Sequence, residues 1–131
     1  MAGFRVIETG AAPAHTGPVP QAVESDGLIF VSALLGTHPQ SGQVAEHAGE
    51  EAEQLFDNLT AILAAAGAGL DDVLRVGISM KHLQRDRPAF NEVWARRFGD
   101  HRPARSAVEV SDFGRPGEAT RYMVEVTARA R

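Results

Sequence analysis

Two side chains in the C-terminal part of the sequence have the chemistry of a reactive site. The first is Arg105, in the segment PARSAVE (residues 103–109), where a β-strand is predicted to begin. A guanidinium group is a rigid, permanently charged fork that binds a carboxylate or phosphate through two parallel hydrogen bonds. Arg105 therefore either clamps a small anionic substrate or forms a salt bridge with Glu109 or Glu125. The spacing of these residues favours neither interpretation.

The second is Glu125, which lies between Val124 and Val126 in the predicted last strand. A carboxylate held among apolar groups can orient or activate water as a general base. The alternative is a structural partner for an arginine, and isolated glutamates in strands more often have that role. Glu125 is thus a candidate general base whose structural alternative stays open.

Asn91 and Ser32 are weaker candidates for binding a ligand. Asn91 follows the apolar Phe90 in AFNEVW, and it either turns its amide into a pocket or is a solvated helix position. Ser32 ends the apolar run LIFVSA and bonds either a ligand or its neighbouring backbone. No G-x-S-x-G motif surrounds Ser32, so a hydrolase nucleophile is not supported.

The composition excludes several classes of protein. The 131 residues include no cysteine, which excludes disulfides, thiolate nucleophiles and the usual structural zinc sites. The acidic and histidine residues of EHAGE, at the start of a predicted helix, are interpreted as a solvated cap, so no metal site is expected. A net charge of −4 argues against nucleic acid and anionic membranes as partners. With no apolar run of membrane-spanning length, we expect a soluble, cytoplasmic protein.

The elements that must position these residues begin with strands. A short strand is predicted over Phe4 to Glu8, followed by a Gly- and Pro-rich loop. Ser25-Asp26-Gly27 predicts a hairpin turn, because Asp and Gly tolerate positive φ. The second hairpin strand, Leu28 to Leu35, is apolar on both faces and is therefore expected to be buried.

Two helices and three further strands follow. Apolar residues at helical spacing predict a helix from Glu46 to Ala66, which Gly67 and Gly69 end. A strand over residues 71–80 places Leu74, Val76, Ile78 and Met80 on one side. A second helix is predicted from Asp86, as N-cap with Pro88 in the first turn, to Phe98. The strand that carries Arg105 and a last strand over residues 121–130 complete the chain.

This order predicts a single α+β domain over residues 1–131, in which two helices cover one face of one sheet. Side-chain alternation is expected to place Arg105 and Glu125 on the same face, the one without helices. That face is mixed in character, so we expect another subunit, rather than bulk water, to cover part of it. The chain is therefore predicted to form a homo-oligomer.

Five segments together resemble the Rid family, also called YjgF or the enamine/imine deaminase family. They are APAHTGPVPQAV, GLIFVSALLGTHPQSG, NLTAILAAAGAGLDDVLRV, FNEVWARRF and RPARSAVEV. The resemblance spans nearly the whole chain in the family's order. It implies a chorismate-mutase-like fold, a homotrimer, and a small-molecule pocket at each subunit interface.

The resemblance also implies roles for individual residues. The arginine of the PARS motif, here Arg105, would grip the carboxylate of a 2-imino acid, and Glu125 would place the attacking water. Asn91 and Ser32 fall on substrate-binding positions of the family. Three further pocket positions depart from the family's usual residues, because this chain has Val19 for a tyrosine, Ala33 for a glycine and Ala107 for a cysteine.

The resulting expectation is a cofactor-independent hydrolase that converts reactive 2-imino or enamine acids to 2-keto acids and ammonia. The departures at Val19, Ala33 and Leu34 imply a less polar pocket, and they motivate an alternative. In that alternative, the trimer binds a small metabolite without turning it over. Endoribonuclease or translation-inhibiting activity, for which some relatives are named, fits poorly with the net charge of −4.

Overall fold

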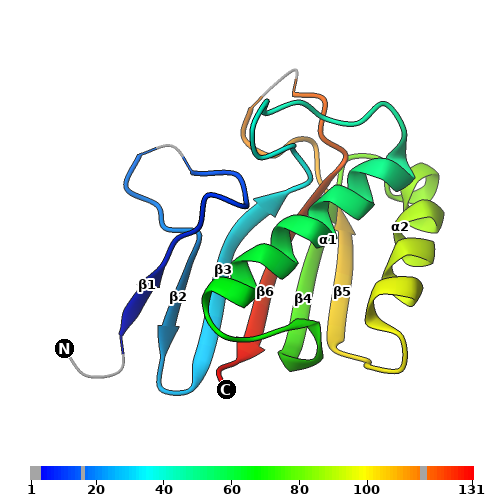
Figure 1. The fold of residues 1–131 in the computed structure, drawn as a ribbon. Helices are drawn as coiled ribbons and strands as arrows, with labels where there is room; N and C mark the ends of the chain where they lie inside the picture. The colour runs from blue at the N-terminus through cyan, green and yellow to red at the C-terminus, as the bar shows by residue number, and fades with distance from the viewer. Residues whose placement is uncertain (1–3, 16, 116–117) are drawn as a thin grey trace.

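The computed structural model describes residues 4–15, 17–115 and 118–131 and contains one mixed sheet with two helices on one face (Figure 1). In chain order its elements are β1 (Arg5–Ile7), β2 (Ala22–Ser25), β3 (Leu28–Leu35), α1 (Ala48–Ala65), the 3-10 turn Leu70–Asp72, β4 (Val73–Met80), α2 (Leu83–Phe98), β5 (Ala104–Glu109) and β6 (Tyr122–Arg129). The predicted α+β architecture is confirmed. No helix in these described ranges is long and apolar enough to cross a bilayer.

The strands lie in the order β1-β2-β3-β6-β4-β5, so the last strand of the chain is central and β5 is an edge. All neighbours are antiparallel except β4 and β5, which run parallel through the α2 crossover. The hairpin turn between β2 and β3 is the predicted one, because Asp26 (φ 52°) and Gly27 (φ 82°) both take left-handed conformations. Gly67 (φ 79°) likewise follows α1, as expected.

The core lies between the sheet and the two helices. Aromatic side chains from α1, α2 and β6 form its centre, with Phe56 and Phe98 at 5.4 Å and Phe90 and Tyr122 at 5.1 Å between ring centroids. Buried aliphatic residues surround them on the helix-facing side of the strands, namely Ile7, Ile29, Val31, Leu34, Val73, Val76, Ile78, Val124 and Val126. The packing therefore fixes both helices against the sheet.

Two predictions about individual strands are wrong. β3 is not buried on both faces, because Phe30, on the side without helices, is 43% exposed. On β4, Leu74 does not join Val76 and Ile78 in the core and is 44% exposed. The pairing of β4 with β6 shifts register between Val73 and Arg75, which moves Leu74 out of the alternation.

The predicted start of α2 at Asp86 is also wrong. The helix begins at Leu83, and Asp86 lies one turn inside it, nearly fully buried. The backbone N–H of Leu83 donates to Oε1 of Glu109 at 2.9 Å, so a carboxylate from β5 satisfies a free donor of the first turn. Because this cap comes from 26 residues further along the chain, the local sequence does not reveal it.

The predicted common face for Arg105 and Glu125 is wrong as well. Arg105 pairs with Val76 of β4, whose side chain is buried beneath the helices, and therefore points to the helix side. Glu125 pairs with Gly77, the next residue of β4, and so points to the opposite, open face. Side chains alternate within each strand as predicted, but the register between the strands is set by tertiary pairing.

Candidate functional site

The Arg105 side chain lies on an aromatic platform at the edge of the sheet. Its guanidinium carbon is 4.7 Å from the ring centre of Trp94 and 5.9 Å from that of Phe90, both on α2. Such stacking is a cation–π contact, and it leaves the guanidinium fork available for hydrogen bonds in its own plane. The crossover from β4 through α2 to β5 thus places Trp94 beneath Arg105 and orients its guanidinium. Sequence patterns predict the strand position of Arg105 but not this orientation.

Arg105 has no carboxylate partner among the residues that the structure describes. Of the two predicted partners, Glu109 caps α2, and Glu125 lies on the other face of the sheet. Partial burial lowers the pKa of Arg105, and the positive charge of Arg87 lowers it further. Both effects disfavour the free cation, so an anion bound here would relieve them.

Two other predicted site residues lie on the same elements as Arg105. Ala107 is two residues further along β5, faces the same side and is half-buried. Asn91 lies on α2, three residues before Trp94, and its side chain is exposed. Residues three apart share a helix face, so Asn91 lies on the same face of α2 as Trp94. We call this group, Arg105, Ala107, Asn91 and Trp94, the arginine edge.

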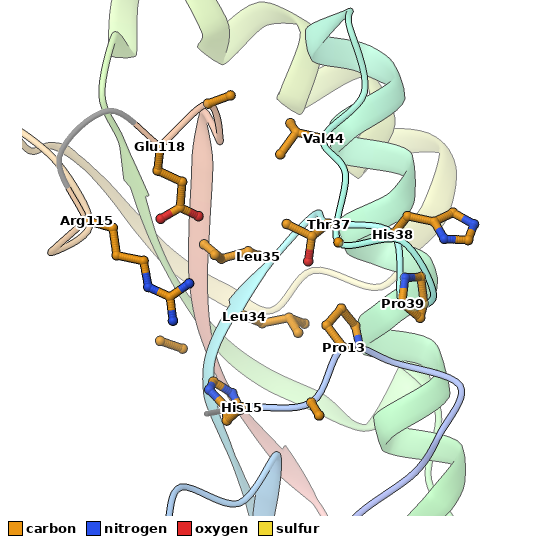
Figure 2. A pocket seen from close by; sticks show the side chains of 14 residues that line it. Pro13, His15, Leu34, Leu35, Thr37, His38, Pro39, Val44, Arg115 and Glu118 are labelled. Atoms are coloured by element: carbon orange, nitrogen blue, oxygen red, sulfur yellow. The ribbon is translucent and has the colours of Figure 1, made fainter. Parts of the chain in front are cut away.

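A cavity of about 670 Å³ opens at the end of β3 (Figure 2). Its walls come from four segments: the loop before β2, the end of β3, the loop before α1 and the loop before β6. The residues that line it are Pro13, Ala14, His15, Ala33, Leu34, Leu35, Thr37, His38, Pro39, Gly42, Val44, Arg115, Glu118 and Ala119. Apolar side chains and polar groups, among them His15, Arg115 and Glu118, share these walls, and such a mixture can hold a small molecule with both polar and apolar parts.

Buried amides hold two of these walls in place. The Gln21 side chain is 1% exposed; its Oε1 accepts from the Thr9 N–H at 2.6 Å, and its Nε2 donates to the carbonyl of Pro13 at 2.9 Å. Asn58 on α1 donates to the carbonyls of Leu35 and Thr37 at 3.0 and 2.9 Å. These bonds replace the ladder hydrogen bonds that irregular loops lack. Neither amide carries a sequence signal that marks it as part of a site.

The remaining predicted substrate-binding residues lie beside this cavity or on its wall. Ala33 lines it. The Ser32 hydroxyl donates to the carbonyl of Pro20 at 2.7 Å, which is the backbone alternative left open for it. Val19 is 45% exposed on the loop before β2. Ser32 thus fixes the loop that carries Val19 against β3.

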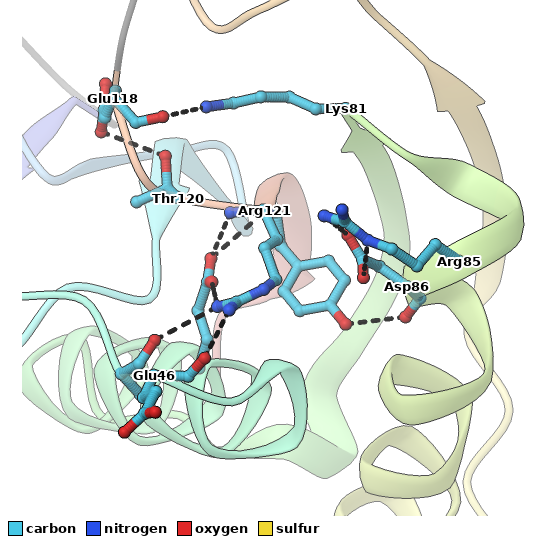
Figure 3. Close-up of polar contacts among 10 residues, drawn as sticks. Glu46, Lys81, Arg85, Asp86, Glu118, Thr120 and Arg121 are labelled. Carbon is cyan, nitrogen blue, oxygen red and sulfur yellow. Dashed lines mark hydrogen bonds and ion pairs between the residues drawn. The ribbon is translucent and has the colours of Figure 1, made fainter.

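Two charged residues of this cavity were missed in the sequence. Arg115 and Glu118 belong to the Gly- and Pro-rich loop between β5 and β6, and both line the cavity. The Lys81 ammonium donates to the Glu118 carbonyl, and the Thr120 hydroxyl donates to Glu118 Oε1 at 3.1 Å (Figure 3). In the sequence, the one local feature is a threonine two residues after a glutamate, and this pattern is too common to identify a binding site.

The arginine edge and the cavity lie apart within one chain. Arg105 is on β5 and Ala33 on β3, and strands β6 and β4 lie between them. Three strand spacings amount to about 14 Å. The predicted site residues are therefore brought together in two groups, and a pocket that uses both groups needs a second copy of the chain. Glu125, exposed on the open face, belongs to neither group.

Known proteins that are similar to this chain in sequence all point to one family. The family described as Endoribonuclease L-PSP matches residues 9–131. A RutC family protein of Pyrococcus abyssi is 39% identical over 107 residues, which cover 81% of this chain and 84% of the relative. Human 2-iminobutanoate/2-iminopropanoate deaminase is 37% identical over 108 residues, covering 82% of this chain and 78% of that enzyme.

Solved structures agree with the sequence relatives. RidA from an Antarctic Psychrobacter species superimposes with a TM-score of 0.87 at 33% identity, and the match covers 95% of this chain and 98% of that one. The two chains therefore share one fold over nearly their whole lengths. Because the family model matches nearly the whole length of the chain, and because these relatives and structures agree with it, the chain belongs to the Rid (YjgF) family.

Proposed function

We propose that this protein hydrolyses reactive 2-imino and enamine acids to 2-keto acids and ammonia, without a cofactor, in pockets formed between the subunits of a homotrimer. One observation carries the proposal: Arg105 is held on Trp94, near the positive charge of Arg87, with no carboxylate partner in the described chain. A small carboxylate would complement this guanidinium in charge and in hydrogen-bonding geometry. The human relative named a 2-iminobutanoate/2-iminopropanoate deaminase supports the substrate class.

The proposed reaction requires only that the protein bind the imine and position a water molecule. A protonated imine carbon is already electrophilic, so water adds to it when the two are held in contact. Arg105 would bind the substrate carboxylate through two hydrogen bonds and fix the orientation of the neighbouring imine carbon. The Asn91 amide, on the same edge, would bind a second polar group of the substrate. Addition of water gives a carbinolamine, which loses ammonia to form the 2-keto acid.

The homotrimer is part of the proposal, because one chain lacks half of the pocket. The cavity at the end of β3, with Ala33 on its wall, would face the arginine edge of a neighbouring copy. Apolar side chains on the open face of the sheet support such an assembly. By their register, Val6, Phe30 and Val108 all lie on this face, and each is more than two-fifths exposed in the single chain. A neighbouring subunit would cover them.

The test is a coupled assay in which an amino-acid oxidase generates 2-imino acids and their disappearance is followed. The expected result is faster imine loss, and faster keto-acid formation, than in buffer alone. The variant Arg105→Ala should lose this acceleration, because both binding and orientation of the carboxylate are removed. Arg102→Ala is the matched control, since Arg102 is exposed and precedes β5. No acceleration with any of several amino acids would refute the proposal.

A second candidate function is binding of a small apolar carboxylate without turnover. The cavity walls favour it, because Leu34, Leu35 and Val44 offer hydrocarbon where a polar substrate would need hydrogen bonds. Calorimetry would separate the two functions. Binding of a 2-keto acid that depends on Arg105, combined with no imine hydrolysis, would favour the binding protein over the enzyme.

A further inference from the structure

Glu118 lines the cavity, and one of its two carboxylate oxygens has no hydrogen-bond partner among the described residues. Oε2 is buried and has no hydrogen-bond partner within the described ranges. Its twin, Oε1, accepts from Thr120, and the backbone carbonyl accepts from Lys81, so the residue is fixed at both ends. A buried carboxylate oxygen without a donor is rare in native proteins and indicates a water molecule or a ligand group at that point.

The surroundings of Glu118 are those of a reaction site rather than of a structural ion pair. Figure 2 shows its carboxylate directed into the space above Leu35, on the side from which Arg115 and His15 also reach in. Arg115 forms no salt bridge with it in the described chain. Of the residues that line the cavity, Glu118 is the one carboxylate.

Glu125 is poorly placed for the same task. Its side chain is exposed on the open face, beside Gly77, and does not line the cavity. Ala33, by contrast, is a wall of the cavity into which Glu118 points. The chain therefore offers one partly buried carboxylate on the wall of the cavity and one exposed glutamate away from it.

We infer that Glu118 is the catalytic carboxylate of this site, holding the attacking water and accepting its proton; this inference rests on the proposed imine hydrolysis. Oε2 accepts a hydrogen bond from the water while the water oxygen forms a bond to the imine carbon, and the C=N electron pair moves to nitrogen. The proton passes to Glu118, which returns it to the amine. The C–N bond then breaks, and ammonia leaves with the bonding electron pair while Glu118 takes the hydroxyl proton and the C=O bond forms. Glu118 passes this proton to the ammonia, giving the 2-keto acid and ammonium.

The experiment compares Glu118→Gln, Glu125→Gln and Glu92→Gln in the coupled imine assay. Glutamine keeps the size and the Oε1 contact but cannot accept the proton, so Glu118→Gln should lower kcat about 10²- to 10⁴-fold. KM should change less than about threefold, because the substrate carboxylate is bound elsewhere. Glu92, exposed on the outer side of α2, is the matched control and should leave both constants unchanged.

A second measurement separates chemistry from structure. The variant Glu118→Ala should regain part of its lost rate when formate is added, because formate can occupy the vacated space and accept the proton. A merely structural glutamate would show no such rescue. Circular dichroism and the urea midpoint of each variant verify the fold.

The outcomes test the role of Glu118 separately from the proposed imine hydrolysis. Loss of kcat in Glu118→Gln, with rescue of Glu118→Ala by formate, supports the inference. An active wild type with unchanged kcat in Glu118→Gln overturns the role of Glu118 alone, and loss in Glu125→Gln would then assign the water to that residue. A wild type that does not accelerate imine loss overturns the proposed function and, with it, this assignment.

Discussion

A pocket shared between copies predicts that two inactive variants restore activity when they assemble together. The first variant is Arg105→Ala, which removes the anion clamp from β5. The second is Ala33→Trp, which fills the cavity at the end of β3 and acts on a different group of residues. Because about 14 Å of sheet lies between β3 and β5, each variant chain keeps one half of the pocket intact.

The size of the recovered activity follows from the geometry. In a ring of copies mixed at random in equal amounts, an intact pocket needs Arg105 from one copy and an unfilled cavity from its neighbour. Each condition holds for half of the copies, so about one quarter of the pockets are intact. The mixture should therefore show about a quarter of the wild-type rate, whereas each variant alone shows none.

The assay uses two differently tagged chains that are unfolded, mixed and refolded. Imine hydrolysis is measured on the whole mixture, after capture on each tag has shown that mixed oligomers form. The control mixes wild type with a chain that carries both substitutions. A shared pocket gives about a quarter of the wild-type rate in this control, and a pocket within one chain gives about half. A mixture of the single variants at the background rate, together with half activity in the control, would refute the shared pocket.

Three further predictions concern the stability and the arginine edge. Glu51→Gln should lower the free energy of unfolding by about 1–3 kcal/mol, because the buried carboxylate accepts from the Arg121 guanidinium and from two backbone N–H groups, and glutamine replaces only one of the two acceptor oxygens. Urea unfolding that changes by less than about 0.5 kcal/mol would contradict this. Hydrogen bonds from the Gly69 N–H and Arg131 lower the pKa of Asp72, so its contribution exists above the ordinary carboxyl pKa and disappears as the pH falls through the lower folded-state value. Asp72→Asn should therefore cost about 1–2 kcal/mol at pH 7 and flatten the acid limb of a stability–pH curve, and an acid limb identical to the wild type's would count against it. Trp94→Leu should raise KM about 2- to 30-fold with little change in the unfolding midpoint, since it removes the platform beneath Arg105; an unchanged KM would show that the ring does not orient the guanidinium.

Local patterns were sufficient for much of the fold. The spacing of apolar residues located both helices, and Asp26-Gly27 located the hairpin, because these signals depend on contacts within a few residues. The start of α2 was missed because the Glu109 carboxylate, which caps it, comes from another strand. The exposure of Leu74 depends on a register shift against β6, which no local pattern encodes.

The site was predictable to a smaller degree. Arg105 was identified as a candidate from its residue type and place, and the structure adds its aromatic platform and the lack of a described carboxylate partner. Its relation to Glu125 could not be predicted, because the face that each strand residue takes depends on pairing with β4. Glu118 lies in an irregular loop, where residue spacing carries no periodic signal, and only the folded chain brings it to the cavity.

The position of β6 also has a consequence for how the chain folds. This strand comes last among the strands, yet it lies between β3 and β4 and joins the two parts of the sheet (Figure 1). During synthesis, β1 to β3 and the later β4-α2-β5 unit cannot complete a common sheet until residues 122–129 have left the ribosome. Pairing across so many residues is slow, and open strand edges persist until then. A stalled chain that lacks β6 would expose the inner edges of β3 and β4 and be prone to aggregation.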